Sequence, residues 1–199
     1  MKKNAFRNSI VHTSLKQPVL AEQLANIAGS FPENKMEILE VCRNWLAGGR
    51  AILKAEFLAT GKVLALLTRH TKLIDSLLTA LYSRIIESEE KIAIIAVGGY
   101  GRNEMFPYSD LDLLFLYDPA HELEATRIVE PLLYILWDLG FKVGQSHRTI
   151  AESVELAKND ITICTNLLDS RFVVGDRKLF DSFRKQFDDE IIQKQNSEF

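Results

Sequence analysis

The chain has little of several features that mark particular classes of protein. Its 199 residues include two cysteines and five prolines, and 24 lysine and arginine residues stand against 27 aspartate and glutamate residues. Cys42 and Cys164 are far apart and lack a metal-ligand spacing, so we exclude a disulfide framework and expect two reduced core thiols. The net charge of −3 and the absence of a broad basic stripe argue against a nucleic-acid-binding protein.

Long apolar runs are also missing. None reaches the roughly 18 residues of a transmembrane helix, and the lysine-containing start lacks the apolar segment of a signal peptide. We therefore expect no membrane partner and a cytoplasmic location. The content of 47% hydrophobic and 26% charged residues is ordinary for a globular protein, and a chain of 199 residues can bury a sizeable core.

The segment that indicates function most clearly begins with an apolar strand followed by a glycine turn. The run from Ile92 to Val97 is short, apolar and bounded by glycine, as is typical of a strand buried on both faces. Gly98, Gly99 and Gly101 follow, and we expect them to adopt positive φ and to let the backbone approach a phosphate closely. Such turns are common, so the glycines alone are a weak indication of phosphate binding.

Two carboxylates open the next apolar run. Asp110 and Asp112 enter the run Leu113–Leu116, and residues two apart on a strand point to the same face. Like charges beside an apolar core repel each other and are costly to desolvate, so they are a poor structural choice without a cation. The pair therefore predicts a site for one or two hard cations, and Mg²⁺ with a nucleoside triphosphate fits it.

The complete motif resembles the signature of the polymerase-β-like nucleotidyltransferases, which is Gly-[Gly/Ser], about ten residues, then Asp-x-Asp. Here Gly98-Gly99, the ten residues from Tyr100 to Ser109, and Asp110-Leu111-Asp112 match it. The string from Val97 to Leu114 is more narrowly similar to the amino-terminal domain of the bacterial PII uridylyltransferases, and the similarity covers about residues 40–180. Asn103 stands where that family usually has glycine, and asparagine tolerates left-handed backbone, so we expect the turn to keep its shape.

The resemblance implies a fold and a domain organisation. We expect an α/β (α+β) protein with a polymerase-β-like nucleotidyltransferase core, built as a small mixed sheet with helices, over residues 89–185. A helical region is expected before it, over residues 1–88, and a charged tail after it, over residues 186–199. The HD hydrolase and ACT domains of the resembling family are expected to be absent, so that the chain is either a fragment or a shortened relative.

The resemblance also implies a reaction, which is Mg²⁺-dependent uridylyl transfer from UTP to a tyrosine of the PII signalling protein. Asp110 and Asp112 would be the catalytic metal ligands. Two alternatives stay open: another acceptor, either a protein that is adenylylated or a small molecule, and a catalytically incomplete module that senses nucleotide or binds a partner. Contacts to the nucleotide and its phosphates are expected from Gly98, Gly99, Gly101, Arg102, Ser109 and Arg148.

Some polar residues have two interpretations each. The superfamily commonly places a third carboxylate on the next strand, yet residues 141–149, which we expect to form that strand, contain none. His147 there either contacts a base or a metal or is structural. Arg102 either contacts phosphate or forms a salt bridge, for example to Glu104, and Asp169 either supports the site or pairs with a neighbour. Asp160 is expected to cap a helix.

Helical periodicity completes the prediction for the rest of the chain. The pattern of residues 32–68 is expected to be interrupted at Gly48-Gly49, and Gly61 is a second candidate for a break. Further helices are expected over residues 124–139, 150–158 and 161–171.

Overall fold

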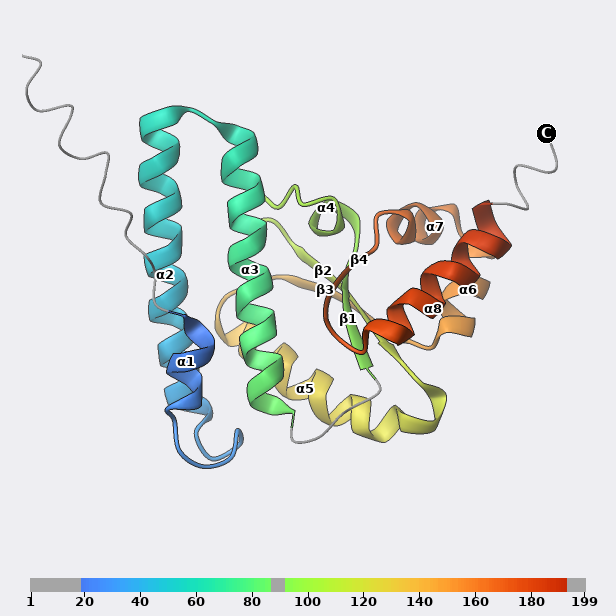
Figure 1. The fold of residues 1–199 in the computed structure, drawn as a ribbon, viewed down its shortest axis with the longest axis horizontal. Helices are drawn as coiled ribbons and strands as arrows, with labels where there is room; N and C mark the ends of the chain where they lie inside the picture. Colours follow the sequence, from blue (N-terminus) through green and yellow to red (C-terminus); the bar gives the residue numbers. More distant parts are fainter. Residues whose placement is uncertain (1–18, 87–91, 193–199) are drawn as a thin grey trace, which may run out of the picture.

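The structure is a computed structural model, and it describes residues 19–86 and 92–192. Its centre is a sheet with the order β3-β2-β1-β4 (Figure 1). β1 is antiparallel to both of its neighbours, whereas β2 and β3 are parallel, so the predicted small mixed sheet is confirmed. The strands are β1 (Ile92–Ala96), β2 (Leu111–Tyr117), β3 (Val143–Arg148) and β4 (Arg171–Gly175).

Helices precede the sheet and cover both of its faces (Figure 1). The long helices α2 and α3 lie side by side ahead of β1, and α5 lies between β2 and β3 in the chain. The α-helices are α1 (Leu20–Ala25), α2 (Lys35–Thr60), α3 (Val63–Ile85), α4 (Gly98–Gly101), α5 (Glu122–Asp138), α6 (Ile150–Asn159), α7 (Ile161–Leu168) and α8 (Arg177–Phe187). A 3₁₀ turn, η1 (Pro119–His121), and a π-helical turn, η2 (Asp188–Ile192), complete the elements.

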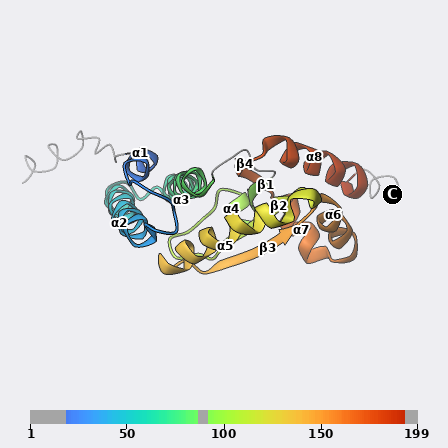
Figure 2. The same ribbon diagram turned by 90° about the horizontal axis from the view of Figure 1, so that it is seen from below.

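The period of two along the buried strands divides the core into two parts. On β1, Ile92, Ile94 and Ala96 pack with residues of α2, α3 and α5, whereas Ala93 and Ile95 pack with residues of α6, α7 and α8. Figure 2 shows the two helical groups, α1–α3 and α6–α8, at opposite ends of the molecule, with the sheet between them. Because α2 and α3 share a continuous apolar core with the sheet, the amino-terminal helices are packed onto the core that carries the motif.

Two expectations about helix boundaries are wrong. Gly48-Gly49 does not interrupt the helix. Instead, α2 continues through both residues and ends at Thr60, before the second candidate, Gly61, whose φ of 67° suits the left-handed cap. The packing of Trp45, Leu46 and Leu53 against the core maintains the helix across the glycines.

The expected helix over residues 161–171 is also too long, because α7 ends at Leu168. The following segment, Arg171–Gly175, forms β4 and pairs with the edge of β1. Its run Phe172-Val173-Val174 favours a strand, and the unpaired groups on that edge of β1 supply the partner.

The expected strands and the expected buried thiols are confirmed. Strands lie within the segments expected over residues 92–97 and 141–149. Pro131 lies inside α5, which continues to Asp138. Cys42 and Cys164 are both buried and free. Within the described residues, no helix is long and apolar enough to cross a membrane.

The predicted domain boundaries stay predictions. The boundary between residues 88 and 89 falls in the segment 87–91, and residues 1–18 and 193–199 also lie outside the described residues. The described part of the expected tail is helical, since α8 reaches Phe187 and η2 follows with Ile191 buried.

Candidate functional site

The glycine turn of the motif forms the short helix α4 directly after β1. Among its glycines only Gly98 has a positive φ, 56°, so the expectation of positive φ at Gly99 and Gly101 is wrong. Gly101 is required for space, because a β-carbon there would lie 2.0 Å from the carbonyl oxygen of Asp169. Asn103 has a φ of 61°, which confirms that asparagine takes the left-handed conformation at this point.

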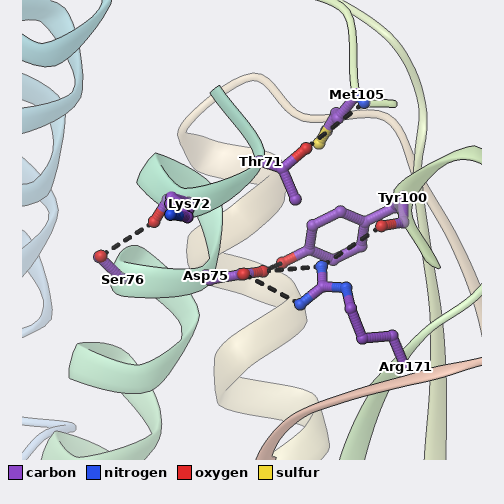
Figure 3. Close-up of polar contacts among 7 residues, drawn as sticks. All are labelled: Thr71, Lys72, Asp75, Ser76, Tyr100, Met105 and Arg171. Atoms are coloured by element: carbon purple, nitrogen blue, oxygen red, sulfur yellow. Dashed lines mark hydrogen bonds and ion pairs between the residues drawn. The ribbon is translucent and has the colours of Figure 1, made fainter. Parts of the chain in front are cut away.

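A partly buried hydrogen-bond network holds this turn against α3 and β4 (Figure 3). The Tyr100 hydroxyl donates to Asp75 at 2.6 Å, and the Arg171 guanidinium donates to both Asp75 oxygens at 2.9 and 3.1 Å. Burial, followed by the charge of Asp75, holds the pKa of Tyr100 well above its usual range, so Tyr100 remains a donor. The sequence did not indicate this network, because its members lie 25 and 96 residues apart.

The loop between the turn and the carboxylates is attached to α3 as well. The amide of Met105 donates to Thr71 Oγ1 at 3.4 Å, and His70 Nδ1 lies 3.1 Å from the Met105 carbonyl oxygen. Near the end of this loop, Tyr108 has a φ of 71°, and the residue is 88% exposed, so burial of its side chain does not account for this conformation. A left-handed backbone is unusual for a bulky residue, and such strain gathers at functional sites.

Asp110 and Asp112 lie where β2 begins, next to the glycine turn. The backbone here is fixed on both sides: Leu111 N–H donates to the Lys142 carbonyl at 2.8 Å, and Val97 N–H donates to the Asp112 carbonyl at 3.2 Å. Burial, and secondly the charge of Asp110, raise the pKa of Asp112 above its usual value. The two like charges therefore act on each other, as expected of residues that share one strand face.

Two further residues surround Asp112 that the sequence analysis did not select. Gly144 is the register partner of Asp112 on β3, and a β-carbon there would lie 2.3 Å from Asp112 Oδ1. A β-carbon on Gly98 would lie 3.5 Å from Asp112 Oδ2 and 3.6 Å from Asn166 Oδ1 of α7. The Asp112 carboxylate thus lies between two glycines, with an amide nearby. A glycine inside a strand is a signal of close approach that could have identified Gly144, whereas no local signal identifies Asn166.

Two other residues predicted to contact phosphate, Arg102 and Ser109, bond to neighbouring residues of the protein. Arg102 pairs with Glu104 at 2.9 Å and with Asp169 at 2.5 Å, which are the salt bridges considered as alternatives for Arg102 and Asp169. Its guanidinium also borders the turn, with Nη2 3.8 Å from the position of a β-carbon on Gly99. Ser109 donates its amide to the Phe106 carbonyl, and a contact from its hydroxyl to phosphate stays a prediction.

The structure does not bring the polar residues of β3 to the carboxylates. Arg148 lies four residues beyond Gly144, about 13 Å further along the strand, so its position gives no support to a phosphate contact. His147 is on the other face of the sheet from Asp112. Its ring centroid lies 4.2 Å from that of Tyr117, which favours the structural interpretation of His147. Asp160 caps α7 as expected, accepting hydrogen bonds from the amides of Thr162 and Ile163.

The donor set fits a hard divalent cation. Asp110 and Asp112 provide carboxylate oxygens, which are the ligands that Mg²⁺ prefers, and the missing side chain of Gly144 leaves room for the Asp112 carboxylate itself. Among residues 19–86 and 92–192, no group of three His, Cys, Asp or Glu side chains gathers as a metal site. Any cation here would therefore be held by two carboxylates, together with oxygens from a substrate or water.

Comparison with known proteins agrees with this arrangement. The family model for a nucleotidyltransferase domain matches residues 80–168, from the end of α3 to the end of α7. The chain is 40% identical over 172 residues to a bifunctional uridylyltransferase/uridylyl-removing enzyme of Erythrobacter litoralis, an alignment that covers 81% of the chain and 19% of that enzyme.

Two further relatives have the same description. The enzyme of Caulobacter vibrioides is 36% identical over 186 residues, with 86% of the chain and 19% of the enzyme covered. That of Azospirillum brasilense is 35% identical over 197 residues, with 93% of the chain and 21% of the enzyme covered. The chain thus spans about a fifth of the length of these relatives. It carries a nucleotidyltransferase domain, and over most of its length it is related to the bifunctional uridylyltransferase/uridylyl-removing enzymes.

Proposed function

We propose that this chain catalyses Mg²⁺-dependent transfer of a nucleotidyl group, with Asp110 and Asp112 as the metal-binding residues. The observation that carries the proposal is the position of these two carboxylates at the start of β2, directly beside the Gly98 turn and inside the matched nucleotidyltransferase segment. The pKa of Asp112, raised by burial and by Asp110, supports it further, because a cation would relieve the repulsion between the two charges.

Each part of the site has a distinct task in this proposal. Asp110 and Asp112 hold the cation, and a bound Mg²⁺ supplies charge neutralisation for the triphosphate oxygens. Gly98 has no side chain on the side that faces Asp112 and Asn166, which leaves space for a phosphate close to the backbone. The network of Asp75, Tyr100 and Arg171 keeps the turn in place, so that its backbone is positioned in advance for a phosphate.

We infer further that the donor is UTP and that the acceptor is a tyrosine of the PII signalling protein. The support comes from the relatives, which are named as uridylyltransferases, and from the sequence motif that resembles the PII uridylyltransferases. In the reaction, the tyrosine oxygen forms a bond to the α-phosphorus of UTP while the bond from that phosphorus to the bridging oxygen breaks. Pyrophosphate leaves, and the hydroxyl proton is released to solvent.

The test is a transfer assay with α-labelled UTP, ATP, CTP and GTP in parallel, each with Mg²⁺ and purified PII protein. Asp110→Asn and Asp112→Asn are the matched variants, since they remove charge with almost no change in size. We expect UMP on a PII tyrosine, detected by gel and by mass spectrometry, and a loss of at least about 100-fold in both variants. Equal labelling by wild type and both variants would contradict the proposal.

One observation favours the alternative of a module that binds nucleotide without turnover. The described residues contain no third acid at the site, which leaves two carboxylates where the superfamily commonly has three. The same assay separates the two functions when metal-dependent binding of UTP is measured beside it. Binding that needs Asp112, together with no label from any nucleotide on PII, would indicate the sensing module.

A further inference from the structure

The site has a neutral polar neighbour whose position the proposed chemistry does not yet use. Asn166 is on α7, an element that packs against the glycine turn. Its helix neighbours Cys164 and Leu167 are buried, whereas Asn166 itself is exposed. Its side-chain amide makes no hydrogen bond to another described residue. The amide is therefore available to a ligand, and the buried face of α7 holds it in place.

The amide and the Asp112 carboxylate reach toward the same point above Gly98. A β-carbon on Gly98 would have two atoms of the described residues within 4 Å, Asp112 Oδ2 at 3.5 Å and Asn166 Oδ1 at 3.6 Å. From these two distances, the two oxygens can be at most 7.1 Å apart. A cation bound to Asp112 at about 2.1 Å has its next ligand oxygen about 2.1 Å further on, and a hydrogen bond to that oxygen adds about 2.9 Å. Fully extended, these contacts span about 7.1 Å, so at any separation up to that limit a phosphate oxygen on the cation is within reach of the amide.

The chemistry of the side chain favours donation to phosphate. Asp110 and Asp112 already place two negative charges at the site, and a triphosphate adds more, so an uncharged hydrogen-bond donor near them can attract the phosphate without adding a charge. The nitrogen and oxygen of an asparagine amide are interchangeable by rotation about the final bond, and the NH₂ group can donate two hydrogen bonds. A bond from such a donor to a charged phosphate is among the stronger kinds in proteins.

We propose that Asn166 is a nucleotide-contacting residue, whose side-chain amide donates to the triphosphate above Gly98, near the Asp112 carboxylate. This inference rests on the proposed function, since it requires a triphosphate held at Asp110 and Asp112. It assigns to α7 a direct role in binding the donor substrate. In this arrangement the phosphates lie above Gly98, in contact with Asn166 and with the cation that Asp112 binds.

The experiment compares the full 199-residue chain with Asn166→Ala, Asn166→Asp, Asp112→Asn and Thr165→Ala. Thr165 is the matched control, because it is an exposed neighbour whose hydroxyl donates to its own helix, to the Ile161 and Thr162 carbonyls. Two quantities are measured: the Kd of α,β-imido-UTP in Mg²⁺, by calorimetry, and the Kd of Mn²⁺ alone, by electron paramagnetic resonance. Thermal unfolding of every variant checks that its fold is kept.

We expect Asn166→Ala to raise the Kd of α,β-imido-UTP by about 10-fold to 100-fold and to leave the Kd of Mn²⁺ unchanged. Asn166→Asp should weaken the nucleotide further, because it removes the donor and adds a negative charge, while Thr165→Ala should match wild type. Unchanged nucleotide binding in both Asn166 variants would overturn the inference. Tighter binding of the nucleotide by Asn166→Asp would also overturn it, because it would make residue 166 a metal ligand.

The two proposals fail in different ways. If wild type binds the analogue in a metal-dependent manner and Asp112→Asn does not, the proposed function stands and the Asn166 variants alone decide the inference. If wild type does not bind the nucleotide analogue, or if Asp112→Asn binds it as well as wild type does, both proposals are overturned.

Discussion

Gly144→Ala tests whether the geometry around Asp112 matters for activity. The φ of Gly144 is outside the left-handed region, so alanine can adopt the same backbone. The new β-carbon would lie 2.3 Å from Asp112 Oδ1, and ordinary contact begins at about 3.4 Å. The Asp112 carboxylate would therefore have to move by about 1 Å, and it can do so by rotating its side chain, without movement of the sheet.

A displacement of this size has a large expected effect on transfer and a small one on folding. A misplacement of about 1 Å in a catalytic arrangement lowers the rate by about 100-fold, so we expect kcat/KM for uridylyl transfer to fall by about that factor. Alanine is a better strand residue than glycine, and the clash involves only the end of a side chain, so the free energy of unfolding should change by less than about 1 kcal/mol. Transfer of label to PII and urea denaturation measure the two quantities, with Mn²⁺ binding as an independent check of the carboxylates.

Gly48→Ala is the matched control. A β-carbon at Gly48 would meet no atom within 4 Å, and its place inside α2 predicts a gain of about 0.5–1 kcal/mol in stability with no change in activity. Wild-type transfer and wild-type Mn²⁺ binding by Gly144→Ala would refute the reasoning, because the Asp112 carboxylate could not then depend on the space above Gly144.

Three predictions concern stability. Tyr100→Phe removes the donor to the Asp75 carboxylate, and we expect a loss of about 1–2 kcal/mol in urea denaturation; an unchanged midpoint would show that this bond contributes nothing. Thr149→Ala removes the side-chain cap of α6 and should cost about 1 kcal/mol in the same assay, so wild-type stability would count against the capping box. Asp112→Asn should increase the free energy of unfolding at about pH 8 and leave it unchanged near pH 3. Burial raises the pKa of Asp112 in the folded chain, so ionisation of its carboxyl group lowers the free energy of unfolding. This loss of stability is absent at pH values below the pKa of Asp112 in the unfolded chain, and it is complete above its pKa in the folded chain. A gain of equal size at both pH values would contradict this explanation.

Local patterns in the sequence were sufficient for the parts of the site that are close together in the chain. The apolar run, the glycines and the Asp-x-Asp pair lie within about twenty residues, and strand alternation alone puts both carboxylates on one face. The left-handed conformation of Asn103 followed equally from its residue type. The cap at Asp160 and the buried free cysteines were local or compositional as well.

Other features depended on pairing between distant segments. Whether Arg171–Gly175 continues a helix or forms a strand is decided by the edge of β1, which lies about eighty residues earlier. The register between β2 and β3 decided whether Arg148 and His147 could reach the carboxylates. Because Asp112 pairs with Gly144, Arg148 lies at the far end of β3 and His147 lies on the face of the sheet away from Asp112. A shift of one residue would have exchanged these faces, and the sequence pattern did not fix that register.

The sequence by itself determined the chemical character of the site: a glycine turn followed by two carboxylates two residues apart, in a chain with a nucleotidyltransferase motif. Only the tertiary structure decided what surrounds them. The Asp75 network that holds Tyr100, the glycine beneath Asp112 and the amide of Asn166 come from α3, β3 and α7. Their positions depend on how the helices pack on the two faces of the sheet, and contacts between residues so distant in the chain are set by packing of the whole core, which no local spacing encodes.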